Sequence, residues 1–299
     1  MLKAVKPEIV KPSKPKFLLS GKSGVGKTSF ALNFPRPYFI DTERGATREQ
    51  YMKKLSESGG AYFGKEQGSQ DFKIVNEEIK QLTTLKHDYQ TLVIDSFTKL
   101  YLMFASIAEE EVGNDYGKDK KEANKPTRQL IRWLEKIDMT VVLICHQKDK
   151  WEGKGKDRTI TGTTFDGYDK FEYDLDLWLE LQKTGKQRDF IIKKSRIDAF
   201  IEGNEIPASY EKFCEMYGRE VINSPVQQLI LATPEQVKKI KHLIEVVRLD
   251  EDIVSKWLKK AEADDFDEMS SNQIEKCISF IEAKLQDIGT TKKEILNAI

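Results

Sequence analysis

Residues 21–28 read GKSGVGKT, a pattern of residue types that can bind the phosphates of a nucleotide. Its glycines let backbone N–H groups turn inward around phosphate oxygens, in conformations that a Cβ would resist. Lys27 would place a positive charge on the β- and γ-phosphates, and the Thr28 hydroxyl would bind Mg²⁺. The apolar run FLLS precedes the loop and a helix-like stretch follows it, as this motif requires. We therefore expect ATP and Mg²⁺ as ligands, bound by Gly21, Lys22, Ser23, Gly24, Val25, Gly26, Lys27, Thr28 and Ser29.

Polar residues at the ends of three further apolar runs could complete a catalytic site. Asp95 ends TLVID and precedes Ser96, the Walker B pattern, so its carboxylate could reach Mg²⁺; a helix N-cap is the alternative. Glu43 follows PYFID and could activate the water that attacks the γ-phosphorus, unless it is a surface residue of a loop. Gln147 follows TVVLIC and could hydrogen-bond the γ-phosphate and report hydrolysis to the next loop. His146 could share that role, although a lone histidine beside an apolar strand is more often structural.

These residues need elements that bring the ends of several strands together. Apolar runs alternate with helical stretches, which predicts a mostly parallel α/β sheet covered on both faces. Strand ends on one side of such a sheet line the ligand crevice. Residues 200–208, FIEGNEIPA, are typical of a hairpin that turns at Gly203–Asn204. The predicted strands are 17–20, 37–41, 91–95, 140–145, 175–181 and 189–194, and the predicted helices are roughly 71–86, 98–111 and 126–137.

Composition divides the chain into four segments. The first is rich in lysine and proline, and is either a disordered tail or an arm that docks on a neighbouring subunit or on DNA. The last is a helical module of about three helices, and capping-box patterns begin two of them at Thr233 and Ser270. The segments are a flexible basic arm (1–15), an ATPase core (16–222), a linker (223–233) and the helical C-terminal module (234–299).

Charge and cysteine content limit the class of protein. The 299 residues include 49 basic and 49 acidic ones, so any basic patch that binds nucleic acid must be local. Cys145, Cys214 and Cys277 lie far apart and match no metal or redox pattern, which is typical of reduced core thiols in a cytosolic protein. No apolar run approaches membrane-spanning length and the N-terminus lacks a signal-peptide core. We expect a cytoplasmic protein with no membrane partner.

Two long polar stretches, 113–128 and 148–170, interrupt the predicted core. Five basic and three acidic residues lie between 148 and 158, and aromatic residues are interleaved with glycine and threonine. Basic groups that track phosphates and rings that stack on bases suit single-stranded DNA. The acidic residues would weaken such contacts, and a mobile surface loop is the alternative. The residues expected to contact DNA are Lys148, Lys150, Trp151, Lys154, Lys156, Arg158, Phe165 and Tyr168.

The ordered set GKSGVGKT, FIDTERGA, LVIDSFTKL and CHQ resembles the RecA-like P-loop ATPases, over roughly residues 16–220. Within them it is most similar to the phage Sak group of single-strand annealing and recombination proteins. The resemblance implies a RecA-like core, an ATPase stimulated by single-stranded DNA, and a filament or ring with ATP at the subunit interface. It makes Glu43 the catalytic glutamate and Gln147 the link to a DNA-binding loop, although His146 stands where the family usually has Asn.

The stretch IIKKSR resembles the K-x-R element that RecA-core ATPases insert into a neighbour's nucleotide site. The resemblance assigns this role to Lys194 and Arg196, and a solvated strand end is the alternative. A phage-encoded chain of this kind would act in the host cytoplasm.

Other functions stay open on the sequence alone. The core could serve a replication motor or helicase loader, a small-molecule P-loop kinase, or a nucleotide-dependent interaction module. Residues 234–299 carry 14 acidic and 11 basic residues, so this tail is a better docking site for a protein, such as a DNA-processing partner, than for DNA.

Overall fold

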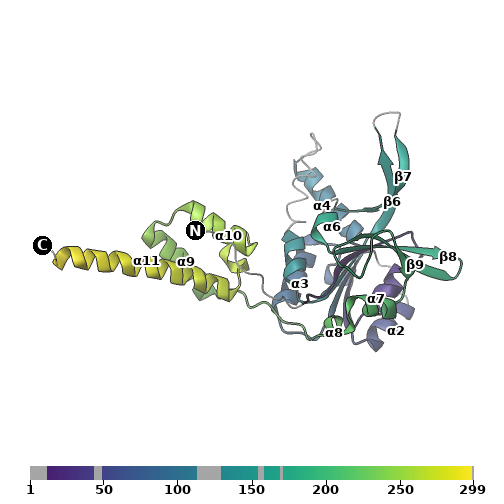
Figure 1. The fold of residues 1–299 in the computed structure, drawn as a ribbon, viewed down its shortest axis with the longest axis horizontal. Coiled ribbons are helices and arrows are strands. Elements are labelled where there is room, and N and C mark those ends of the chain that lie inside the picture. The colour runs from purple at the N-terminus through teal and green to yellow at the C-terminus, as the bar shows by residue number, and fades with distance from the viewer. Residues whose placement is uncertain (1–11, 44–48, 113–128, 154–157, 169–170, 298–299) are drawn as a thin grey trace. The chain divides into compact units, whose positions relative to one another are not determined.

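The computed structural model describes residues 12–43, 49–112, 129–153, 158–168 and 171–297. The chain forms two compact units, residues 1–227 and 228–299, and each is considered on its own (Figure 1). The boundary between them falls inside the predicted linker. Residues 1–11 of the predicted arm and the polar stretch 113–128 lie outside the described residues.

An eight-stranded sheet forms the centre of the first unit, in the order β10-β9-β8-β1-β5-β4-β2-β3. The strands from β8 to β3 in this order are parallel, whereas β9 and β10 are antiparallel to their neighbours. This arrangement confirms the predicted α/β class. The strands are β1 (Lys16–Ser20), β2 (Pro37–Asp41), β3 (Ala61–Phe63), β4 (Thr91–Asp95), β5 (Thr140–Ile144), β8 (Leu177–Thr184), β9 (Gln187–Ser195) and β10 (Glu205–Pro207).

Helices lie on both faces of this sheet, as the continuous apolar strands require (Figure 1). One face carries α1 (Lys27–Ala31), α2 (Glu49–Glu57), α7 (Tyr210–Tyr217) and α8 (Arg219–Ile222), whose buried side chains share one core cluster. The other side carries α3 (Phe72–Thr84) and α4 (Phe97–Val112), with a further helical stretch at 129–136. The predicted helices 71–86, 98–111 and 126–137 correspond to these last three.

Aromatic rings hold α1 and α7 against the sheet. Phe213 of α7 lies 5.0 Å from the ring of Phe17 and 5.3 Å from that of Phe34, measured between centroids. Phe30 of α1 meets Phe190 of β9 edge-on at 4.7 Å. All five rings are buried. The helix that follows the phosphate loop is too short to be stable alone, so packing against the sheet stabilises it.

The first unit differs from the sequence predictions in two hairpin regions, and β3, α2, α7 and α8 were not predicted. The polar stretch after β5 is an antiparallel hairpin, β6 (His146–Glu152) and β7 (Thr159–Asp166), that stands out from the core (Figure 1). It was missed because its side chains are mostly exposed and leave no apolar period. The predicted hairpin at 200–208 is also wrong, since β10 pairs with β9 and residues 200–204 only connect them. Gly203, at φ +83°, supplies the turn in this connection.

The second unit contains α9 (Pro234–Val247), α10 (Glu251–Ala261) and α11 (Ser271–Asn297). Both predicted capping boxes are confirmed, because Thr233 and Gln236 exchange hydrogen bonds, as do Ser270 and Gln273. Ile240, Phe266 and Ile274 lie in its buried core. None of the helices within the described ranges is long and apolar enough to cross a membrane.

We predict that Phe213→Ala lowers the free energy of unfolding by about 3–5 kcal/mol, because it empties the centre of the aromatic cluster. Urea unfolding followed by circular dichroism measures this change. Ile201→Ala, which truncates a side chain that is 61% exposed, is the control and should cost far less. Equal effects of the two substitutions would contradict the packing role of Phe213.

Candidate active site

The parallel strands bring four loops to one edge of the sheet. In the strand register, Asp41 lies beside Asp95 and Asp95 lies beside Ile144, so β2, β4 and β5 end at one level. Ile144 also pairs with Leu19, one residue before the end of β1. A pocket of about 710 Å³ opens at this edge. All predicted phosphate-loop residues except Val25 line it, together with Glu43, Asp95, His146 and Gln147.

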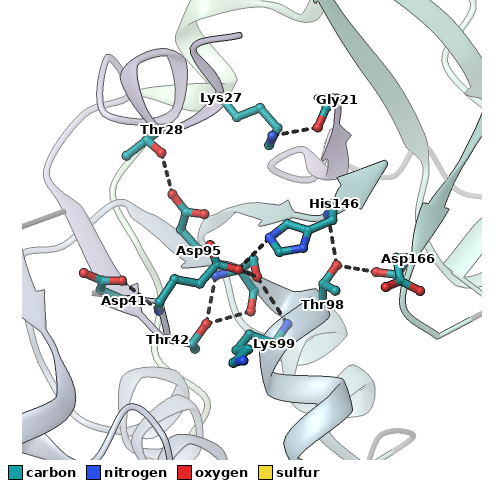
Figure 2. Close-up of polar contacts among 12 residues, drawn as sticks. Gly21, Lys27, Thr28, Asp41, Thr42, Asp95, Thr98, Lys99, His146 and Asp166 are labelled. Carbon is teal, nitrogen blue, oxygen red and sulfur yellow. Dashed lines mark hydrogen bonds and ion pairs between the residues drawn. The ribbon is translucent and has the colours of Figure 1, made fainter. Parts of the chain in front are cut away.

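The phosphate loop has the backbone that its glycines permit. Gly21 and Gly26 have φ of +149° and +112°, and a Cβ on Gly21 would lie 2.5 Å from the Leu181 carbonyl oxygen. The Lys27 ammonium donates a hydrogen bond to the Gly21 carbonyl at 2.7 Å (Figure 2). It also donates to the Lys22 carbonyl at 2.9 Å. Burial lowers the pKa of Lys27, and the charges of nearby carboxylates only partly oppose this. A phosphate group here would stabilise the charged ammonium.

Thr28 and Asp95 present two oxygen atoms side by side. The Thr28 hydroxyl donates to Asp95 Oδ2 at 2.6 Å (Figure 2). This donor pair fits Mg²⁺, which binds oxygen and usually takes its other ligands from water and phosphate. The described residues contain no cluster of three or more histidine, cysteine or acidic side chains that could hold a metal without such ligands. Burial raises the pKa of Asp95 to about 6, although the Thr28 hydrogen bond opposes the shift.

Glu43 is held at the wall of the pocket by three groups. Its carboxylate accepts hydrogen bonds from the Ser96 hydroxyl and, at 2.6 Å, from Nε2 of His146. Its backbone N–H donates to the Asp41 carboxylate at 3.0 Å, and Asp41 also accepts from the Tyr62 hydroxyl at 2.9 Å. The side chain of Glu43 stays partly exposed to the pocket. A carboxylate oriented in this way can accept a proton from a water molecule.

The chain leaves the pocket at His146 and Gln147 and enters the β6–β7 hairpin. Both residues line the pocket, but the imidazole of His146 is the group that contacts Glu43. The His146 backbone N–H donates to the Thr98 hydroxyl at 2.9 Å, and that hydroxyl donates to the Asp166 carbonyl at the end of β7 (Figure 2). Both strands of the hairpin are therefore tied to the pocket wall.

Comparison with known proteins identifies the fold. A family model described as an AAA domain matches residues 13–206, more than half of the chain. The chain belongs to this family. The match includes the phosphate loop, Glu43, Asp95 and the β6–β7 hairpin, so the nucleotide-binding ATPase character of an AAA domain applies to this pocket. No curated protein matches the chain at a significant level.

The sequence did not identify Arg188 as a pocket residue of the AAA domain. It lies at the start of β9, and its Nε donates to the Val25 carbonyl of the phosphate loop at 2.8 Å. The available signal was the short turn around Gly185 between two strand-like runs, which predicts a hairpin. That hairpin places Arg188 opposite Lys183, level with the loop. Gln50 and Tyr51 of α2 also line the pocket and were not predicted.

Lys194 and Arg196 lie away from the pocket of their own chain. Because β9 runs antiparallel to β8, Lys194 lies opposite Trp178 near the start of β8, and Arg196 follows toward the opposite edge of the sheet. Lys194 donates to the Leu175 carbonyl, and the Arg196 guanidinium donates to a backbone carbonyl and lies 3.8 Å from the Asp176 carboxylate. Neither side chain lines the nucleotide pocket.

The residues expected to contact DNA have mixed environments. Phe165 and Tyr168, expected to stack on bases, are core residues instead, at 4% and 2% exposure. Phe165 packs edge-on against Trp178 at 5.0 Å, so burial of the hairpin base accounts for the error. Trp151 is 50% exposed, and the Arg158 guanidinium lies 5.9 Å from its ring centre.

The hairpin lysines make ion pairs within the hairpin. Lys148 lies 2.9 Å from the Asp166 carboxylate, and Lys150 lies 3.2 Å from that of Glu152. Such exposed pairs contribute little free energy. Lys154 and Lys156 lie outside the described residues.

We predict that Asp95→Asn stabilises the protein without nucleotide at pH 7 but not at pH 4. The pKa of Asp95 is higher in the folded chain (about 6) than its ordinary value of 3.8, so the folded state binds the proton more tightly. The free energy of unfolding therefore falls as pH rises from about 4 to about 6, and stays lower above that range. Removing the charge by Asp95→Asn should raise the free energy of unfolding by about 2–3 kcal/mol at pH 7.

Urea unfolding at the two pH values, without Mg²⁺, measures this difference. Asp149→Asn removes an exposed carboxylate and is the control. A stability difference that is the same at pH 4 and pH 7 would contradict the burial cost assigned to Asp95.

Proposed function

We propose that this AAA domain hydrolyses ATP between copies of the chain and couples hydrolysis to single-stranded DNA, as an annealing or recombination protein similar to the phage Sak group. The observation that carries this proposal is the path of the chain out of the pocket. His146 contacts the carboxylate that would activate water, and the same strand continues as the exposed β6–β7 hairpin.

The pocket residues suit the hydrolysis of ATP. The backbone of the phosphate loop and the Lys27 ammonium would bind the phosphates, and Glu43 would take a proton from the attacking water. Mg²⁺ held by Thr28 and Asp95 would neutralise charge on the phosphate oxygens. Ser96 and His146 would keep the Glu43 carboxylate oriented toward the water.

The contact between His146 and Glu43 also supports coupling in the proposed cycle. A movement of β6 would shift the imidazole and therefore the carboxylate that it contacts. In the other direction, a change at the γ-phosphate would reach the hairpin through His146 or Gln147, since both line the pocket. DNA bound to the hairpin would in this way alter the rate of hydrolysis.

One face of the hairpin suits stacking on bases. Side chains alternate along a strand, so Trp151 shares a face with Gln147 and Asp149, and the paired residue Ile160 lies beside it. Trp151 and Ile160 are both at least half exposed, and Arg158 adds a cation next to the indole. Aromatic and cationic groups in this combination bind single strands with little sequence preference.

The position of Lys194 and Arg196 supports action on a neighbouring copy. They lie at the edge of the sheet opposite their own pocket, where a second copy stacked in the same direction would present its nucleotide. Arg196 is the more exposed group, with half of its side chain accessible. Its charge would stabilise the transition state of hydrolysis in the neighbour.

We predict that single-stranded DNA stimulates ATP hydrolysis and that the stimulation fades as salt rises, because phosphate contacts release counterions. Trp151→Ala should raise the DNA concentration for half-maximal stimulation about tenfold, since one stacked base is worth roughly 1–3 kcal/mol. A steady-state phosphate-release assay across a salt series gives both quantities. Ile201→Ala removes an exposed apolar side chain outside the hairpin and is the matched control.

Lys27→Ala should abolish hydrolysis under all of these conditions, and undiminished turnover in that variant would refute the site. Hydrolysis that is indifferent to any nucleic acid would refute the coupling and favour a kinase or a protein-remodelling ATPase. Transfer of the labelled γ-phosphate to a metabolite instead of water would identify the kinase.

We predict that Arg196→Ala lowers ATP hydrolysis by roughly 10³-fold, the order expected of an arginine that stabilises phosphoryl transfer. Mixing it with Lys27→Ala should recover activity, because an intact pocket of the first variant can meet an intact Arg196 of the second. The measurement is the turnover of mixtures at a fixed total concentration. Turnover no greater than the sum of the separate variants would contradict action on a neighbour.

A further inference from the structure

The turn between β8 and β9 brings an arginine back over the phosphate loop. Arg188 donates its Nε–H to the Val25 carbonyl at 2.8 Å, and its side chain forms part of the pocket wall. A Cβ added to Gly26 would lie 3.1 Å from the same nitrogen, so the guanidinium packs directly against the backbone of the loop. Its place at the loop is therefore set by both a hydrogen bond and close packing.

Within the described residues, no carboxylate pairs with the charge of Arg188. Among the described residues it makes no ion pair, and its direct partner across the ladder is Lys183, which shares the same face of the hairpin. Like charges in directly opposite positions destabilise a pair of strands. Further along β9, by contrast, Lys193 lies 3.7 Å from the buried carboxylate of Glu180 and is compensated. An anion bound beside the loop would supply a partner for this charge.

We propose that Arg188 binds the nucleotide in cis, with Nε anchored on the loop and its terminal amino groups donating to the α- or β-phosphate. This assignment rests on the proposed function, because it requires the pocket to hold ATP. Val25 and Gly26 belong to the part of the loop that surrounds the α- and β-phosphates, whereas Lys27 extends toward the β- and γ-phosphates. A guanidinium suits the position because it can bond the loop and an anion at once.

The first test compares the affinity of ADP and of a non-hydrolysable ATP analogue, by calorimetry, in Arg188→Ala, Arg188→Gln and Arg188→Lys. We expect Arg188→Ala and Arg188→Gln to lower the affinity for both nucleotides by about tenfold or more, because each variant loses a charged hydrogen bond to phosphate. Lys keeps the charge and should bind more tightly than Gln. Lys53→Ala removes one positive charge from a highly exposed position on α2 and serves as the control.

The comparison of Gln with Lys decides between binding and support of the loop. The Arg188→Gln variant keeps a side-chain donor for Val25 but has no charge. If it binds nucleotide as tightly as Arg188→Lys, or more tightly, the proposal is overturned. A loss confined to the ATP analogue would also overturn it, since the α- and β-phosphates are present in ADP. Thermal unfolding of each variant without nucleotide identifies any general loss of structure.

The second test separates this inference from the wider function. Mixing Arg188→Ala with Lys27→Ala should not recover hydrolysis, because the arginine is missing from the pocket that must turn over. Recovery would overturn the action in cis. If instead Lys27→Ala binds both nucleotides like the unmodified chain, the pocket itself is wrong, and the failure belongs to the proposed function.

Discussion

The pocket depends on a single constraint, which is that β1, β5, β4 and β2 end at one level of a parallel sheet. Helices cover both faces of these strands, so some of the charged groups at their ends are partly withdrawn from water. Burial then raises the pKa of Asp95 and lowers that of Lys27, which means that each charged form is destabilised in isolation. A nucleotide phosphate with Mg²⁺ would relieve both costs at once. Such a ligand would therefore offset part of the cost of burying these two residues.

The base of the β6–β7 hairpin is packed more firmly than its exposed arms. Phe165 lies against Trp178, whose indole donates to the Ser20 hydroxyl at 2.7 Å, one residue before the phosphate loop begins. Thr163 also donates to the buried carboxylate of Glu180 at 2.7 Å. The hairpin is thus anchored both to the strand that precedes the phosphate loop and, through His146, to Glu43. In the proposed coupling, these contacts would carry movement of the hairpin to the pocket.

The sequence predicted the parts of the AAA domain that are governed by burial. β1, β2, β4 and β5 are nearly continuous apolar runs, and the glycines of the phosphate loop have the positive φ that their type permits. The hairpin was missed because backbone pairing holds its arms together with few buried side chains. Phe165 and Tyr168 were misread because residue type does not distinguish an aromatic ring that anchors a loop from one that binds a ligand. Arg188 required the register of β8 and β9, which pairs residues that a local pattern treats separately.

Because of its direction, β9 begins beside the phosphate loop and ends away from it. Its first residues lie level with the phosphate loop, where Arg188 bonds Val25. Its last residues and those that follow lie toward the other edge, where Lys194 and Arg196 donate to backbone carbonyls and Arg196 lies beside Asp176. In an assembly of copies stacked in one direction, each nucleotide would meet the start of its own β9 and the end of a neighbour's. In that proposed assembly, a shift of this strand would be sensed by two pockets, and the antiparallel pairing of β8 and β9 would provide a link between them.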